Sequence, residues 1–141
     1  MLSVKPGDQV LDLGCGLGAM LVFLSRYPIK VTGIDIVKVF CVLSRLRLYL
    51  LPFRKARTSV INKDFRFISF NNFTIIYAFL VPDALAVLRP KFEAEMRDEA
   101  LLITYKCPAL LSTELFDQSV FEEQPNSFFF FYRKKAIVLN R

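Results

Sequence analysis

The sequence feature that most constrains the fold is a glycine-rich turn between an apolar run and a helix-like segment. The run from Val10 to Leu13 contains Asp12 and leads into three alternating glycines, Gly14, Gly16 and Gly18. Glycine tolerates positive φ and has no Cβ to hold a ligand away from the backbone. A helix that follows such a turn directs free N–H groups toward it. The stretch predicts a buried parallel strand, a ligand-binding turn and a helix, with a ligand-free βα turn as the simpler alternative.

Two classes of cofactor fit this turn. As G-x-G-x-x-[GA], formed by Gly14, Gly16 and Ala19, it matches a dinucleotide fingerprint, which also needs an acid about 20 residues further on. Asp35 satisfies that requirement. As D-x-G-x-G-x-G, the stretch is similar to the first motif of the S-adenosylmethionine (SAM) methyltransferases. Asp12 favours the second interpretation, because a carboxylate there would repel a pyrophosphate but suits a cofactor that carries an ammonium and a sulfonium.

Composition excludes several other chemistries. The chain has no histidine, so catalytic triads and histidine bases are excluded. Its cysteines, Cys15, Cys41 and Cys107, are three in number and form no C-x-x-C pair, which argues against a zinc site or a disulfide framework. A net charge of +6 mildly favours acidic partners. Any chemistry must use carboxylates, lysines, tyrosines, backbone groups or a cofactor.

Length and hydropathy indicate one soluble domain. The 141 residues suffice for a single core, so we expect one domain over residues 1–141. Apolar residues make up 54% of the chain, yet Pro82 and Asp83 interrupt its most apolar window. No apolar stretch reaches the roughly 18 residues of a transmembrane helix, and the first residues do not resemble a signal peptide. We therefore expect a cytoplasmic protein without a transmembrane segment.

Strands and helices alternate after the turn. The expected strands cover residues 9–13, 30–36, 58–62, 73–79 and 100–105, and the expected helices 18–27, 38–51 and 83–98. Pro90 predicts a kink or a frayed turn in the third helix. The remainder reads as antiparallel strands, and the four phenylalanines within 127–133 predict a strand inside the sheet. The pattern indicates an α/β fold, with a doubly wound, Rossmann-like, mainly parallel sheet and a C-terminal antiparallel strand pair.

Acidic residues recur where the parallel strands end, the edge at which such sheets bind ligands. A carboxylate at Asp35 can accept both hydroxyls of a ribose, and Ile36 beside it can lie against an adenine face. Asp64 and Phe65 follow the third strand, where a carboxylate could accept the adenine amino group. Capping of the loop is the alternative role for Asp64. Pro82 falls at the same edge, after the fourth strand.

These residues resemble the class I, seven-strand SAM-dependent methyltransferases. Residues 12–18 are similar to motif I, residues 33–35 to motif II, and Asp64 to the adenine-contacting acid. The resemblance implies a minimal class I methyltransferase domain with SAM as its cofactor. The cofactor-binding residues that it implies are Asp12, Gly14, Cys15, Gly16, Gly18, Asp35, Ile36, Asp64 and Phe65.

A narrower resemblance indicates the acceptor. Residues 44–47, residues 77–82 and the helix from Lys91 to Asp98 are similar to a small family of prokaryotic methyltransferases. The same family includes mitochondrial lysine methyltransferases that act on inner-membrane proteins. It implies methyl transfer to a lysine amine of a protein substrate. The acceptor-side candidates are Phe79, Leu80, Val81 and Pro82, whose apolar groups would keep an amine neutral by desolvation.

The chain departs from this family at several positions. The family usually has Asp in place of Leu17, Arg in place of Ala19, and Asn-Pro in place of Val37 and Lys38. It also usually has a helical segment before Val4. We therefore expect a partly uncovered cofactor pocket that lacks some polar contacts. A weakened or non-catalytic relative is one alternative.

Two further alternatives remain open. A nucleic-acid methyltransferase would use a basic run, Arg45, Arg47, Arg54, Lys55 and Arg57, as a phosphate track. The simpler interpretation of that run is a solvated helix edge and loop. A nicotinamide oxidoreductase would bind NAD, but it leaves Asp12 unexplained.

Overall fold

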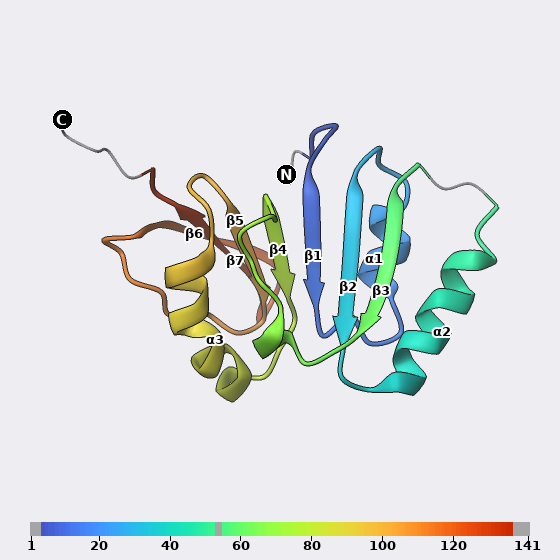
Figure 1. The fold of residues 1–141 in the computed structure, drawn as a ribbon. Helices are drawn as coiled ribbons and strands as arrows, with labels where there is room; N and C mark the ends of the chain where they lie inside the picture. The colour runs from blue at the N-terminus through green and yellow to red at the C-terminus, as the bar shows by residue number, and fades with distance from the viewer. Residues whose placement is uncertain (1–3, 53–54, 137–141) are drawn as a thin grey trace. The chain divides into compact units, whose positions relative to one another are not determined.

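The computed structural model describes residues 4–52 and 55–136. They form two compact units, and the boundary between the units lies between Ile68 and Ser69. In Figure 1 the colour runs from blue at the N-terminus to red at the C-terminus. The single domain expected over residues 1–141 stays a prediction.

The first unit is a set of parallel strands joined by helices (Figure 1). Strand β2 lies between β1 and β3 and pairs with both in parallel. The register places Asp12 opposite Gly33 and Asp35 opposite Asn62. The elements are β1 (Gln9–Leu13), α1 (Ala19–Leu24), β2 (Lys30–Asp35), α2 (Lys38–Tyr49), β3 (Arg57–Asn62) and the 3-10 helix η1 (Phe65–Phe67).

The core of this unit lies between β1, β2 and α1. Leu11 and Leu13 of β1 and Leu21 of α1 are completely buried. Gly33 on β2 lets α1 come close, because a Cβ there would lie only 2.6 Å from Leu21 Cδ1. The helix α1 is shorter than the expected 18–27. The hydroxyl of Ser25 donates to the Val22 carbonyl at 2.7 Å, a local bond that competes with continuation of the helix.

The second unit combines a parallel and two antiparallel strand pairs. Strand β4 pairs with β5 in parallel, β5 with β7 antiparallel, and β7 with β6 antiparallel. Strand β7 thus lies between two others, so the expectation that its phenylalanines occupy an interior strand is confirmed. The elements are β4 (Ile75–Ala78), α3 (Pro82–Glu95), β5 (Leu101–Tyr105), β6 (Phe116–Gln124) and β7 (Ser127–Lys134).

Helix α3 begins at Pro82, where the missing N–H costs nothing, with Asp83 in its first turn. It continues past Pro90, so the expectation of a frayed turn there is wrong. The helix ends at Glu95, three residues before the expected 98. Its buried side consists of Leu85, Leu88 and Phe92, and their packing outweighs the lost backbone hydrogen bond.

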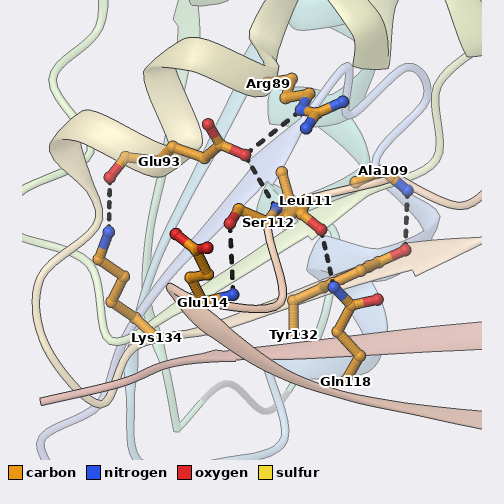
Figure 2. A network of polar contacts seen from close by, with 9 residues as sticks. All are labelled: Arg89, Glu93, Ala109, Leu111, Ser112, Glu114, Gln118, Tyr132 and Lys134. Atoms are coloured by element: carbon orange, nitrogen blue, oxygen red, sulfur yellow. Dashed lines mark hydrogen bonds and ion pairs between the residues drawn. The ribbon is translucent and has the colours of Figure 1, made fainter.

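The connection between β5 and β6 has no helix and is held by polar contacts (Figure 2). Glu93 of α3 accepts a hydrogen bond from Ser112 N at 2.9 Å, and its carbonyl accepts one from Lys134 Nζ. The hydroxyl of Tyr132 accepts from Ala109 N at 2.9 Å. These contacts tie the connection to both α3 and β7.

None of the helices within the described residues has the length and apolar character that a membrane span needs.

Candidate cofactor site

The glycine turn is fixed to the end of β2 by its own backbone. Both Gly14 N and Cys15 N donate to the Ile34 carbonyl, at 2.8 and 2.9 Å. Gly16 N donates to Asp35 Oδ2 at 2.9 Å. Three consecutive N–H groups are therefore committed to β2, and the turn has one defined position before any ligand binds.

Helix α2 fixes the other side of the turn. The completely buried Ser44 donates its hydroxyl to the Gly16 carbonyl at 2.7 Å. A Cβ on Gly18 would lie 2.9 Å from Ser44 Oγ, and Gly18 has φ +76°. Glycine is thus required at 18 by close packing on α2 as well as by the backbone conformation. Arg47 Nη1 adds a long contact of 3.4 Å to the Leu17 carbonyl.

Gly16 differs from Gly18 because its side-chain direction is open. A Cβ at Gly16 would meet nothing within 4 Å, at φ +51°. No packing inside the described residues therefore explains the missing side chain. The open direction is the space that a ligand lying close to the backbone would use, as the turn motif predicts.

Asp12 is a buried carboxylate with an unsatisfied atom. Its side chain is only 3% exposed, and Oδ2 has no hydrogen-bond partner among the described residues. Burial, with a smaller contribution from the charge of Asp35, raises the pKa of Asp12 to about 7. A buried acid of this kind favours a positively charged partner. Asp12 and Asp35 lie beside a turn whose N–H groups at 14, 15 and 16 already have acceptors. Two acidic groups suit the ammonium and sulfonium of SAM, whereas they would repel a pyrophosphate.

Asp35 organises the end of β2. Its Oδ2 accepts from Gly16 N, and its Oδ1 accepts from Val37 N at 2.8 Å. Its carbonyl accepts from Asn62 Nδ2 at 3.0 Å and from Lys63 N at 3.1 Å. A carboxylate has about four acceptor positions, so two remain for further donors. The predicted contact with ribose hydroxyls fits this remaining capacity.

The predicted adenine side of the site is less complete. Ile36 is 65% exposed. This exposure fits an apolar residue that becomes covered when a ligand ring lies against it. Asp64, in contrast, accepts from Arg66 N at 2.9 Å and forms an ion pair with the Arg66 guanidinium. Its hydrogen bonds to Arg66 lower the pKa of Asp64. The structure shows the loop-capping role, and the adenine contacts of Asp64 and the half-buried Phe65 stay predictions.

Cys15 contributes its backbone to the site and no reactive thiol. The side chain is 7% exposed. Burial, followed by the charges of Asp12 and Asp35, raises its pKa to about 12. Thiolate chemistry at neutral pH is therefore excluded at this position.

Sequence reasoning missed three residues that position the turn. Ser44 falls within a motif of the family resemblance, and a polar residue on the buried side of an apolar helix is the signal that could have identified its role. Cys41 Sγ donates to the Asp35 carbonyl at 3.4 Å, and Asn62 supports the same carbonyl. The role of Cys41 depends on how α2 packs on β2 and that of Asn62 on strand register, and no local pattern reveals either.

The acceptor-side candidates lie in the second unit, after β4. Phe79 and Val81 are 53% and 66% exposed, Pro82 is exposed, and Leu80 is half-buried. The Phe79 ring lies edge-on to Tyr105 of β5, with centroids 5.3 Å apart. Lys106 Nζ lies 5.8 Å from the Phe79 centroid and 5.6 Å from that of Tyr105. This aromatic pair, which includes the unpredicted Tyr105, already binds an ammonium group.

The basic run does not form one track beside the turn. Arg45 donates two hydrogen bonds to the Val60 carbonyl, at 3.2 and 2.7 Å. Lys55 and Arg57 lie at the opposite, amino-terminal edge of the strands, where with Lys30 they line a cavity of about 340 Å³. Arg54 lies outside the described residues.

The fold is that of the class I SAM-dependent methyltransferases, and S-adenosyl-L-methionine is the cofactor of that class. More narrowly, the chain belongs to the family of the ANTKMT methyltransferase domain, whose model matches residues 12–109.

Solved structures show the same fold at low sequence identity. An RNA methyltransferase from Salinibacter ruber in complex with S-adenosyl-L-homocysteine superposes with a TM-score of 0.80 at 13% identity, covering 95% of this chain and 85% of that one. A SAM-dependent methyltransferase from Methanosarcina mazei gives 0.70 at 16% identity, covering 95% of each chain.

Curated relatives show higher sequence identity over a smaller share of the chain. The carboxy-S-adenosyl-L-methionine synthase of Vibrio cholerae is 33% identical over 109 residues, which is 71% of this chain and 44% of the relative. That of Vibrio vulnificus is 32% identical over 130 residues, 86% of this chain and 48% of the relative. The chain thus spans about half the length of these relatives.

Proposed function

We propose that this chain transfers the methyl group of SAM to an amine, the side chain of a lysine in a protein substrate. The observation that carries the amine is the aromatic pair of Phe79 and Tyr105, which holds the Lys106 ammonium over both rings. The resemblance to mitochondrial lysine methyltransferases supports the same acceptor. The curated relatives are named carboxy-S-adenosyl-L-methionine synthases, and this similarity supports a cofactor of the SAM type and not the acceptor.

The cofactor supplies an electrophilic methyl group, so the protein needs to orient the reactants and to keep the acceptor amine neutral. Asp12 and Asp35 would hold the positively charged and hydroxyl-bearing parts of the cofactor, and Gly16 leaves room for it. The amine loses its proton to solvent before attack. The aromatic rings attract the charged form of the amine, whereas removal of water by Phe79 and Val81 would lower its pKa and favour the neutral form. Because both side chains are exposed, the substrate itself must cover them.

Nucleic acid is the second candidate acceptor, favoured by the exposed cations Lys30, Lys55 and Arg57 around one cavity. The S. ruber neighbour is an RNA methyltransferase, but at 13% identity it supports the fold alone. These cations lie at the strand edge opposite the glycine turn. A nucleic acid bound there would not extend along the turn, which makes the amine the better supported acceptor.

Calorimetric titration with SAM, S-adenosyl-L-homocysteine and NAD tests the cofactor, and transfer of a labelled methyl group tests the acceptor. We expect binding of the first two ligands, no binding of NAD, and methylation of poly-lysine. The double variant Phe79→Leu, Tyr105→Leu should lower poly-lysine methylation at least tenfold while SAM affinity stays unchanged. Methylation of transfer RNA without methylation of poly-lysine would establish the second candidate instead.

If the cofactor pocket binds SAM only weakly, restoring the polar residues usual in the family should strengthen binding. Leu17 is 51% exposed, and Arg47 donates a hydrogen bond to its carbonyl. An acidic side chain at position 17 would therefore lie near the Arg47 guanidinium. Leu17→Asp with Ala19→Arg should tighten SAM about tenfold, since a charge-assisted hydrogen bond contributes roughly 1.5–3 kcal/mol. If the parent binds no SAM at millimolar concentration and the double variant binds no better, the chain is a methyltransferase fold kept for another purpose.

A cytoplasmic location is part of this proposal. Cys15, Cys41 and Cys107 are free thiols, which is the usual state in a reducing compartment.

A further inference from the structure

The outer side of α2 is apolar although it faces solvent. Residues three and four apart share one side of a helix. The buried side of α2 consists of Cys41, Ser44 and Leu48. The opposite side forms an apolar stripe whose members are 44% to 77% exposed: Val39, Val42, Leu43, Leu46, Tyr49 and Leu50. Soluble helices normally place polar residues at such positions, so this stripe indicates a contact surface.

All charged residues in the segment that contains the stripe are lysines or arginines. From residue 36 to residue 63 the sequence has seven lysines and arginines and no aspartate or glutamate. Helical spacing places Lys38 and Arg45 along one border of the stripe and Arg47 along the other, and all three are exposed. Arg45 and Arg47 are held in place by the Val60 and Leu17 carbonyls. An apolar stripe bordered by fixed cations is the pattern of a helix that lies in a lipid–water interface.

We propose that α2 binds the surface of an anionic lipid bilayer, with the stripe at the boundary of the acyl chains and the flanking cations at the phosphates. Apolar burial and positive charge are the two signals that stable interfacial binding needs. A second copy of this chain is the poorer occupant, because it would bring the same acid-free, cationic segment against the first. The proposal does not depend on the proposed methyl acceptor.

The test uses flotation with vesicles of phosphatidylcholine, with or without phosphatidylglycerol. We expect binding to the mixed vesicles, weakened by added salt, and little binding to phosphatidylcholine alone. The variant Val42→Gln, Leu46→Gln should bind the mixed vesicles at least tenfold more weakly. Both side chains are about half exposed, so the fold and SAM affinity should persist, as circular dichroism and calorimetry can verify. Val87→Gln on α3, where the side chain is 61% exposed, is the matched control and should bind as the parent does.

A second measurement tests the proposal even if the double variant does not fold. The chain has no tryptophan, so Tyr49→Trp, at a position 77% exposed, introduces a single fluorophore in the stripe. Its emission should shift to the blue with the mixed vesicles, whereas that of Val87→Trp should not. Equal binding to both kinds of vesicle, no binding to either, or a dimer in sedimentation that Leu46→Gln dissociates would each overturn the proposal.

Discussion

Gly16 and Gly18 have different roles, which single substitutions can distinguish. Gly16→Ala should weaken SAM binding by a hundredfold or more, because its Cβ enters the open space beside the turn. Its cost in stability should stay near the roughly 1–2 kcal/mol of a left-handed residue. Gly18→Ala should destabilise the fold more strongly, because its Cβ meets Ser44 Oγ at 2.9 Å. Calorimetric titration and thermal unfolding check the two effects, and equal SAM affinity in Gly16→Ala and the parent would show that the open space is not used.

A buried acid makes stability depend on pH. The pKa of Asp12 is about 7 in the folded state and near 3.8 in the unfolded state. The contribution of Asp12 to the free energy of unfolding is therefore highest below pH 4 and is lost as the pH rises through 7. Asp12→Asn carries no charge. It should be more stable than the parent above pH 7, by about 4 kcal/mol at most, with the difference disappearing near pH 4. Urea unfolding across this range is the measurement, and a difference that does not vary with pH would refute the assignment.

At the scale of elements, a short hydrogen bond from a buried serine joins α2 to the turn. Ser44→Ala removes the donor to the Gly16 carbonyl and leaves a buried acceptor unpaired, a loss of roughly 1–3 kcal/mol. Ser44 is a positioning residue, so SAM affinity should fall as well. Ser25→Ala is the matched control, because Ser25 also donates at 2.7 Å to a carbonyl but lies away from the turn. It should lose comparable stability and keep its SAM affinity. A fall in affinity in both variants would remove the special role of Ser44.

The sequence predicted the order and type of the parallel elements because their signals are local. Alternating apolar runs, Pro82 before α3 and the glycines of the turn each act within a few residues. The end of α1 and the continuity of α3 were missed, since a side-chain hydrogen bond from Ser25 and packing around Pro90 decided them. In the candidate site, Asp12, Gly16 and Asp35 were predicted from spacing, and their contacts with the cofactor stay predictions. Ser44 and Tyr105 were not predicted, because their partners come from other elements.

At the scale of the molecule, the positive charge can be reversed locally. Arg54→Glu, Lys55→Glu and Arg57→Glu together lower the net charge from +6 by six. If the amine is the acceptor, poly-lysine methylation, thermal stability and retention on an RNA column should all stay close to those of the parent. Loss of a salt-sensitive RNA complex, measured by gel shift at two salt concentrations, would instead support the nucleic-acid alternative.

The raised pKa of Asp12 gives this carboxyl a use as an optical reporter. Imidazole normally dominates proton exchange near neutral pH, and this chain has none. A carboxyl with a pKa of about 7 is partly protonated at that pH, and its protonated carbonyl stretch is distinct from the bands of ionised carboxylates. A cation bound beside it would favour the ionised form, so the band would fade and a proton would appear in the buffer. Ligand occupancy could then be followed without a label, a coupled enzyme or knowledge of the acceptor.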